Sequence, residues 1–460
     1  MKVVKFGGSS LASAQQLQKV LDIVKSDPSR RFVVVSAPGK RNPEDTKVTD
    51  ALIKYYRSYT NEDDVSSHQE WIINRYKAII DELGLSHSIL DKISAAITGL
   101  ATLPIEGNDF LYDTFLAAGE DNNAKLIAAY FRKNGLPARY LHPGNAGIIV
   151  SSEPGNAQIL PGSYDKLEEL RDSDEVLVIP GFFGVTVDKQ ICTFSRGGSD
   201  ISGSIVAAGV KADLYENFTD VDGIFAAHPG VVHKPHSIKE LTYREMRELA
   251  YAGFSVLHDE ALIPAYRGRI PLVIKNTNNP SHPGTRIVLE HSKQELPVVG
   301  ISGDDKFVSI NISKYLMNRE VGFGRKVLQI LEELNIRWEH IPTGIDDMSI
   351  ILRERELTPI KEREIQAHLM QNLGVDEVEF ERDLSIIMIV GENMKNQVGV
   401  MSTATTAMSD KGINIEMISQ GSSEVSVMLV IQSKHEKTAV RAIYKAFFGE
   451  ENQDKKKWFD

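Results

Sequence analysis

Residues 1–10 read MKVVKFGGSS, and this stretch decides how the fold begins. An apolar run ends at Phe6, two glycines allow a tight backbone turn, and Ser9 is a good N-cap for a helix over 11–25. Lys5 stands near the end of the apolar run, so its charge lies beside the turn. A strand, a glycine turn and a helix in this order are typical of a parallel α/β sheet.

The same alternation of apolar runs and amphipathic stretches continues through the first two thirds of the chain. Several of the apolar runs are apolar throughout, as buried parallel strands tend to be. Strands are predicted at 3–6, 32–37, 138–141, 176–182, 213–217 and 271–276, and helices at 14–25, 49–56, 70–83, 124–134 and 202–208. This alternation predicts a mainly parallel sheet covered by helices on both faces.

Composition and charge exclude several classes of protein. The 460 residues are 42% hydrophobic and 25% charged, which is ordinary for a globular protein. The net charge of −11 argues against a nucleic-acid partner, because such partners normally need a basic surface. A single cysteine, Cys192, rules out an internal disulfide. No apolar run has the length of a signal or membrane segment, so we expect a cytoplasmic enzyme with no membrane partner.

The last third of the chain contains an internal repeat at an offset of 77 residues. Without a gap, this offset aligns Ile310 with Ile387 and Gly322 with Gly399. Each copy predicts a strand, a glycine loop, a helix, two strands joined by a turn and a second helix. We expect three domains, at 1–292, 298–382 and 383–449, with a strand near 298–303 that can pair with either copy.

Three motifs follow strands of the predicted sheet and suit phosphate chemistry. The amides of the KFGGSS turn, with Lys5 beside them, can hold phosphate oxygens. SRGGSD at 195–200 offers Arg196, whose planar fork suits a carboxylate, and Asp200, which can orient a lysine or hold magnesium. TDVDG at 219–223 suits nucleotide contacts at the same sheet edge. Each motif read alone has a plain alternative: a simple turn, a helix-capping ion pair, or an Asp-Gly turn.

Taken together, the motifs resemble those of the aspartate kinases of the amino acid kinase superfamily. KFGGSS, VVVSAPGK with KVTD, AAGE, SRGGSD, TDVDGIF, ELAYAGFSVLH and KNTNNPSHPGT occur in that family's order, and the doubled C-terminal unit resembles its paired ACT domains. The resemblance implies an amino acid kinase fold followed by two α+β, ferredoxin-like ACT domains. It also implies an enzyme that uses ATP and Mg²⁺ to phosphorylate the side-chain carboxylate of L-aspartate, the first step of lysine, threonine and methionine biosynthesis.

The resemblance assigns roles to individual residues. Lys5 and Asp200 are the expected catalytic pair. The expected aspartate-binding residues are Ser36, Thr49, Glu120, Arg196, Gly198 and Ser199, with Glu120 at the amine and Arg196 at a carboxylate. The expected nucleotide-binding residues are Lys5, Gly7, Gly8, Ser9, Thr219, Asp220, Phe225 and Lys275. No residue is assigned as a protein ligand of a metal.

One departure from the family pattern lies after TDVDGIF. Many members carry an arginine where this chain has Gly230. The nearby His228 is either a replacement ligand or a surface histidine.

The C-terminal copies are expected to bind a regulatory amino acid. The effector residues implied by the resemblance are Met317, Gly322, Phe323, Gly324, Glu339 and Asn414, with Glu339 on the second strand of its copy. We expect feedback inhibition by lysine, with threonine as the second candidate, and a homodimer or dimer of dimers joined through the ACT domains. Three alternatives stay open: copies that only dimerise, a kinase for glutamate or N-acetylglutamate, and a non-catalytic amino acid sensor.

Overall fold

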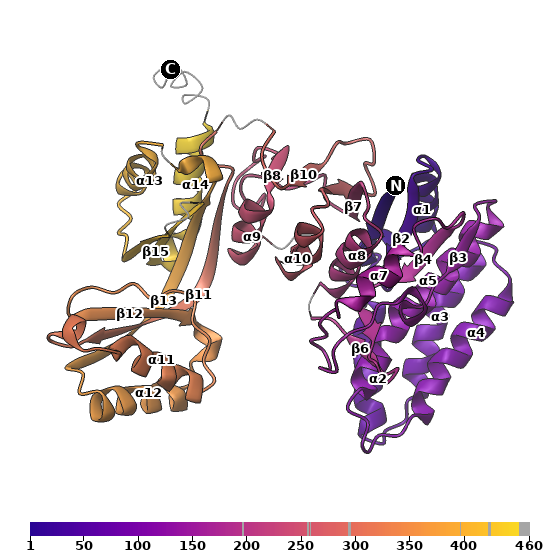
Figure 1. Ribbon diagram of the computed structural model, residues 1–460, viewed down its shortest axis with the longest axis horizontal. Coiled ribbons are helices and arrows are strands. Elements are labelled where there is room, and N and C mark those ends of the chain that lie inside the picture. Colours follow the sequence, from indigo (N-terminus) through magenta and orange to yellow (C-terminus); the bar gives the residue numbers. More distant parts are fainter. Residues whose placement is uncertain are drawn as a thin grey trace. The chain divides into compact units, whose positions relative to one another are not determined.

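The computed structural model describes residues 1–195, 197–254, 257, 259–292, 296–395, 397–421 and 425–449. The chain forms two compact units (Figure 1). The first consists of residues 1–224, 237–246 and 255–292, and the second of residues 225–236, 247–254 and 293–460. Within the part of the chain that is described, no helix combines the length and apolar character needed to cross a membrane.

The first unit is built around an eight-stranded sheet in the order β3-β4-β2-β1-β7-β9-β10-β8. Its strands are β1 (Lys2–Phe6), β2 (Arg30–Val35), β3 (Ala138–Tyr140), β4 (Val176–Pro180), β7 (Leu214–Thr219), β8 (Glu240–Thr242), β9 (Leu272–Asn276) and β10 (Thr285–Val288). The strands from β3 to β9 in this order pair in parallel, whereas β10 runs antiparallel to β9. The prediction of a mainly parallel sheet is confirmed, and a strand forms at each predicted position.

Helices cover both faces of this sheet. The helices that lie wholly in the first unit are α1 (Ala14–Lys25), α2 (Val48–Thr60), α3 (Ser66–Glu82), α4 (His87–Gly99), α5 (Leu111–Lys133), α6 (Pro143–Ala146), α7 (Gly162–Glu168), α8 (Gly198–Gly209) and α10 (Asp259–Arg267), whereas α9 (Tyr243–Tyr251) begins in the first unit and ends in the second. Apolar side chains of α1 to α5 pack on one face, against Val4, Phe6 and Val33. Helix α8 contacts β1, β2 and β7. Because side chains alternate along a strand, Lys5 points to the face opposite Val4 and Phe6, which is the face of α8.

Helix α5 is longer than predicted, and a hairpin was missed. The sequence pattern predicts helix only at 124–134, but α5 starts at Leu111. The missed half contains Asp113 and Glu120, whose buried polar side chains interrupt the apolar periodicity. The hairpin pairs β5 (Phe183–Val185) with β6 (Ile191–Thr193) and leads into the SRGGSD motif.

The predicted helix cap at Ser9 is wrong. A 3₁₀ turn, η1 (Gly8–Leu11), follows β1 and has no side-chain cap. Helix α1 begins only at Ala14, where the side chain of Ser13 accepts a hydrogen bond of 3.3 Å from the amide of Gln16. The extra turn moves the capping position to Ser13.

A buried ion pair joins two strands that flank β1. Nε and Nη2 of Arg30 donate to the two carboxylate oxygens of Glu216 at 2.6 and 3.0 Å. The side chains of both residues are less than one tenth exposed. Such a bidentate contact has a defined geometry, so it fixes how β2 and β7 lie against β1.

The second unit is built around a five-stranded sheet in the order β12-β11-β13-β15-β14, with antiparallel pairing throughout. Its strands are β11 (Gly300–Ser313), β12 (Asp347–Arg353), β13 (Glu377–Val390), β14 (Met417–Gln420) and β15 (Ser426–Gln432). Its helices are α11 (Phe323–Glu333), α12 (Pro359–Asn372), α13 (Val400–Ser409) and α14 (Glu436–Phe448). An offset of 77 residues carries both ends of β11 onto those of β13, so the sequence repeat is also a structural repeat.

The two copies share this sheet through β11 and β13. Residues 300–304 of β11 pair with residues 386–390 of β13, whereas residues 307–313 pair with residues 377–384. Residues 307–313 also pair with β12. The strand near 298–303, which the sequence left open, therefore pairs with the strand of the second copy.

Candidate active site

The centre of the candidate site is an ion pair between Lys5 and Asp200. Lys5 Nζ lies 2.6 Å from Asp200 Oδ1, and both side chains are largely buried. The same oxygen accepts a hydrogen bond of 2.8 Å from Nδ2 of Asn217, which is opposite Lys5 in the register of β1 and β7. Residues far apart in the sequence thus meet on one face of the sheet. Asn217 was missed, because an asparagine inside an apolar strand gives no sign of its partner.

The KFGGSS turn lies directly beyond Lys5. Its first amide, from Gly7, donates to the carbonyl of Phe218 at 3.1 Å. Gly8 lies against Gly39 of the VVVSAPGK motif, whose amide donates to the carbonyl of Gly8 at 2.9 Å. A Cβ on Gly39 would come within 2.5 Å of the carbonyl carbon of Gly8, so only glycine fits this crossing. Gly39 was not among the predicted site residues. Ser9 lies in the same turn, within η1.

The second glycine turn leads into helix α8. Gly197 has φ 79°, a left-handed conformation that favours glycine. A Cβ on Gly198 would come within 2.5 Å of the Phe182 ring. Ser199 is buried in the first turn of α8, next to Asp200. The predicted carboxylate clamp, Arg196, lies outside the described residues.

Helix α5 brings Glu120 to the end of β2. Glu120 is 5% exposed, and its Oε2 is buried without a hydrogen-bond partner. Burial raises the pKa of Glu120 to about 7, although the amide of Ala37 and the charge of Lys5 act in the opposite direction. One turn later, Nδ2 of Asn123 donates to the carbonyl of Ser36 at 2.7 Å. Thr49, the other predicted hydroxyl, lies in the first turn of α2.

The predicted nucleotide residues of the first unit divide between the two faces of the sheet. Thr219 ends β7, and its hydroxyl donates to the exposed Asp220 at 3.2 Å. Lys275 is opposite Phe218 in the register of β7 and β9, and its Nζ lies 6.0 Å from the centroid of the Phe218 ring. Paired residues of parallel strands point to the same face, so Lys275 lies on the face opposite Lys5. Burial lowers the pKa of Lys275.

The last predicted nucleotide residue, Phe225, belongs to the second unit. The carbonyl of its neighbour Ala226 accepts from the amide of Ile301 at 2.8 Å. In the same segment, Nδ1 of the exposed His228 accepts from the amide of Gly230 at 3.0 Å. Nδ1 of His228 therefore already accepts a hydrogen bond within the turn that contains Gly230, the position at which many family members carry an arginine.

Most of the predicted effector residues surround the start of helix α11. Met317 is buried in η3 (Met317–Arg319), Gly322 has φ 81° at the N-cap, and Phe323 is buried in the first turn. A Cβ on Gly324 would lie 3.7 Å from Cε of Met348, in ordinary contact. Asn414 is exposed between α13 and β14.

The expectation that Glu339 lies on a strand is wrong. Only an isolated bridge forms beside it, between His340 and Ile351. Glu339 Oε1 accepts from Nε of Arg353 at 3.2 Å, and its other oxygen accepts from the hydroxyl of Tyr251. Arg353 also pairs with Asp304 at 2.6 Å, so Glu339 shares its cation with a second carboxylate of the second unit.

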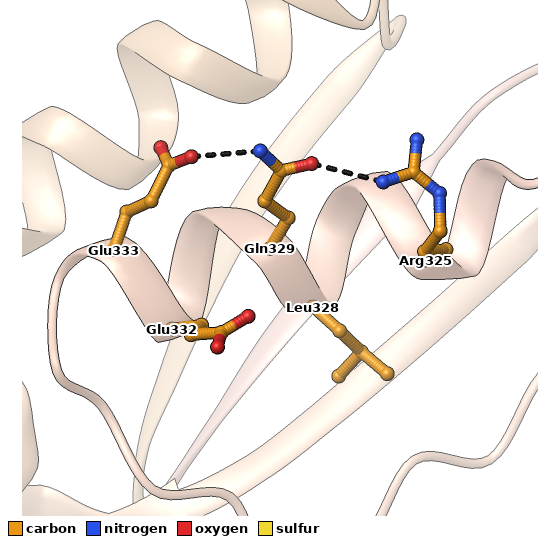
Figure 2. Close-up of a pocket in the computed structure, with 5 residues that line it drawn as sticks. All are labelled: Arg325, Leu328, Gln329, Glu332 and Glu333. Carbon is orange, nitrogen blue, oxygen red and sulfur yellow. Dashed lines mark hydrogen bonds between the residues drawn. The ribbon is translucent and has the colours of Figure 1, made fainter.

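A surface pocket of the second unit runs along the outside of α11. Figure 2 shows its lining, in which Gln329 accepts from Arg325 at 3.0 Å and donates to Glu333 at 2.8 Å. Contacts at this spacing stabilise the helix itself. None of the predicted effector residues lines this pocket.

Comparison with known proteins agrees with this geometry. The model of the amino acid kinase family matches residues 1–276, and a model of the ACT domain matches residues 387–447. Aspartokinase 3 of Bacillus subtilis is 54% identical over 448 residues, which cover 97% of this chain and 99% of the relative. The chain belongs to the aspartokinases of the amino acid kinase family. The predicted aspartate kinase activity and the predicted ACT region are thereby confirmed.

Solved aspartokinase structures have the same fold. Aspartate kinase from Clostridium acetobutylicum is 36% identical, with a TM-score of 0.85 over 97% of this chain and 100% of that chain. Aspartokinase III from E. coli, solved in complex with lysine and aspartate, is 23% identical, with a TM-score of 0.76 over 97% of this chain and 99% of that chain. At that level of identity the second comparison shows the fold alone.

Proposed function

We propose that Lys5 and Asp200 are the catalytic pair that transfers the γ-phosphoryl group of ATP to the side-chain carboxylate of L-aspartate. The observation that carries this proposal is the 2.6 Å contact between the Lys5 ammonium and the Asp200 carboxylate, beside the KFGGSS turn. Phosphoryl transfer depends mainly on positioning and on neutralising charge at the transferred group. A lysine that is held in place beside a turn rich in amides meets both needs.

The chemical step then divides between these groups. Lys5 neutralises charge on the transferring phosphoryl group, and Asp200 with Asn217 keeps the Lys5 ammonium in place. Amides of Gly8 and Ser9 hold phosphate oxygens from below the transferring group, whereas the Gly7 amide already donates to the carbonyl of Phe218 and shapes the turn. The attacking carboxylate of aspartate is already ionised, so the step needs no general base.

Two charged groups of the substrate, its ammonium and a carboxylate, are assigned to side chains of the site. We assign Glu120 to the ammonium, because its buried carboxylate has an oxygen without a hydrogen-bond partner. The aspartate carboxylate is assigned to Arg196 with the start of α8, and the flanking hydroxyls to Ser36 and Thr49; Gly198 and Ser199 form that start of α8. The nucleotide is assigned to Thr219, Asp220, Phe225 and Lys275.

Magnesium fits the donor set at Asp200. Oδ1 of Asp200 already contacts the Lys5 ammonium and accepts a hydrogen bond from Asn217, so Oδ2 is the oxygen that we assign to the ion. Mg²⁺ usually binds one or two carboxylates and takes its other ligands from substrate phosphates and water. When bound, the ion neutralises charge on the ATP phosphates.

The second unit is proposed to bind lysine as a feedback inhibitor, with threonine as the second candidate. The amide of Gly322, at the start of α11, suits an effector carboxylate, whereas the amide of Phe323 already donates to the carbonyl of Glu320 at 3.2 Å. The related C. acetobutylicum enzyme is described as allosteric. Glu339 would have to share its carboxylate between the effector ammonium and Arg353. We also propose a homodimer or dimer of dimers that is joined through this unit, and a cytoplasmic location. The proposed domains are residues 1–292, 298–382 and 383–449.

An assay of ADP release, with isothermal titration of lysine, tests both parts. ADP release is measured with ATP, Mg²⁺ and either aspartate, glutamate or N-acetylglutamate, and then with aspartate plus lysine or threonine. We expect release only with aspartate, and inhibition by lysine. Release that does not depend on magnesium would contradict the metal assignment, and an unchanged rate together with no heat of lysine binding would remove the lysine proposal.

A further inference from the structure

A second buried carboxylate on helix α5 is not used in the chemistry described above. Asp113 lies in the first turn of α5 and is 1% exposed. Its Oδ2 accepts hydrogen bonds from two backbone amides outside the helix, at 2.6 Å from Thr193 and at 2.9 Å from Gly155. Its Oδ1 is buried without a hydrogen-bond partner.

Among the described residues, no lysine, arginine or histidine forms an ion pair with the carboxylate of Asp113. The neighbouring Cys192 thiol stays neutral, because burial and then the charge of Asp113 raise the pKa of the thiol to about 11. Burying an unpaired carboxylate is costly, and a neutral side chain could accept the same two bonds. Hydrogen bonds from amides to an ionised oxygen are about twice as strong as neutral ones, so a charge here gives a firmer hold on the backbone.

The backbone that Asp113 holds leads into the second glycine turn. Thr193 is the last residue of β6, and its carbonyl accepts from the amide of Ala157 at 3.0 Å. The next amide, from Phe194, donates to the carbonyl of Phe182 at 2.9 Å. The exit of β6 is therefore fixed from several sides shortly before α8 begins at Gly198.

The same helix carries Glu120. Residues 113 and 120 are two turns apart on α5 and therefore lie on the same side of it. Asn123, one turn further on, holds the carbonyl of Ser36. Helix α5 therefore forms hydrogen bonds both to the end of β6, which leads to α8, and to Ser36, which follows β2 near Glu120.

We propose that Asp113 is a positioning residue for the aspartate pocket. By tying the end of β6 to α5, it sets the separation between Glu120, which takes the substrate ammonium, and the start of α8, which takes a substrate carboxylate. The inference rests on the roles proposed for Glu120 and for Gly198 and Ser199. Asp113 itself touches neither aspartate nor ATP.

The test compares Asp113→Ala, Asp113→Asn and Glu120→Gln with the wild-type enzyme, by KM for aspartate, KM for ATP and thermal midpoint. Asp113→Ala should raise KM for aspartate about tenfold or more and leave KM for ATP within about twofold. Asp113→Asn keeps an oxygen that accepts both amides but loses the charge that strengthens these bonds, so it should raise KM for aspartate by only about threefold. Ile97→Ala, a fully buried change on α4, is the control for general loss of stability and should leave both KM values unchanged.

Each outcome bears on one of the two proposals. Equal changes in both KM values, or an unchanged KM for aspartate in Asp113→Ala, would overturn the positioning role. Should Asp113→Ala not fold, Asp113→Asn decides: a rise of about threefold confined to the aspartate KM supports the role, and no rise contradicts it. If Glu120→Gln leaves the aspartate KM unchanged, the assignment of Glu120 fails, whatever Asp113 does.

Discussion

Glu120 should make aspartate binding depend on pH near neutrality. Its carboxylate is buried on α5 with an unpartnered Oε2, and burial raises its pKa to about 7. In the role proposed for it, only the ionised form accepts the substrate ammonium. The ionised fraction is about one tenth at pH 6, about one half at pH 7 and about nine tenths at pH 8.

The apparent affinity falls by the fraction of enzyme that is competent to bind. The KM for aspartate should therefore be about tenfold higher at pH 6 than at pH 8. The value of kcat should change little from this group, because the bound ammonium keeps Glu120 ionised in the complex. At pH 7, binding of aspartate should release about half a proton per site, since about half of the free enzyme is protonated at Glu120.

Two measurements check these values. Initial rates of ADP release are recorded with varied aspartate and saturating ATP at pH 6, 7 and 8 and constant ionic strength. Calorimetry in buffers of different ionisation enthalpy counts the released protons. The control is Glu120→Gln, whose side chain does not titrate and whose KM should be high and flat with pH. A wild-type KM that stays constant within about twofold, or the same pH dependence in Glu120→Gln, would refute the reasoning.

The same group affects stability with a definite sign. The pKa of Glu120 is higher in the folded protein than its usual 4.5, so the folded state holds more protons between pH 4.5 and 7. Stability is then fully present below pH 4.5 and declines as the pH rises through about 7. The loss approaches about 3 kcal/mol at pH 8. Without substrate, Glu120→Gln should therefore melt at a higher temperature than wild type at pH 8, and at nearly the same temperature at pH 5.

Three further changes test other parts of the structure. Lys5→Ala or Asp200→Ala should lower kcat at least about a hundredfold, because each removes one half of the pair that stabilises charge in the transition state; single-turnover rates check this. Gly39→Ala should destabilise the first unit by about 1–3 kcal/mol and raise KM for ATP, because its Cβ would collide with the KFGGSS turn; denaturant unfolding and steady-state rates check this. Glu216→Ala should cost about 3–5 kcal/mol of folding free energy, measured by denaturant unfolding, because it leaves Arg30 buried without its partner.

Matched controls separate these causes. Gly99→Ala also adds a methyl group, but nothing lies within 4 Å of its Cβ, so it should leave the KM for ATP unchanged. A normal KM for ATP in Gly39→Ala would mean that the turn does not hold phosphates. Wild-type turnover in Lys5→Ala would contradict its catalytic role, and an unfolding free energy unchanged in Glu216→Ala would show that the ion pair contributes nothing.

The elements of the fold were predictable because apolar spacing reports burial directly. The runs at 3–6, 32–37 and 176–182 became central parallel strands, and the repeat at 77 residues became β11 and β13. Burial on both faces leaves an unbroken apolar run, and that pattern needs no knowledge of the partner strand. The first half of α5 was not predicted as helix, because its buried side chains include polar ones that interrupt the apolar spacing.

Side-chain partners were predictable only where a motif supplied them. Lys5 and Asp200 were expected together, but Asn217, Gly39 and Asp113 were not, because their contacts depend on strand register and on which loops cross. Lys275 illustrates the limit. Its position in the sequence suits a phosphate contact, yet which face of the sheet it occupies follows from its pairing with Phe218.

The buried carboxylates of the first unit explain why Glu120 is the natural place for a substrate cation. Glu216 is balanced by a bidentate contact with Arg30, and Asp113 is held by two backbone amides. Asp113 and Glu120 each keep a buried oxygen without a hydrogen bond, but Glu120 is the one that feels the charge of Lys5 at the candidate site, and burial raises its pKa to about 7. A buried carboxylate of this kind is stable only when protonated or when a cation arrives. The ammonium group of aspartate would supply that cation, so binding and deprotonation of Glu120 should occur together.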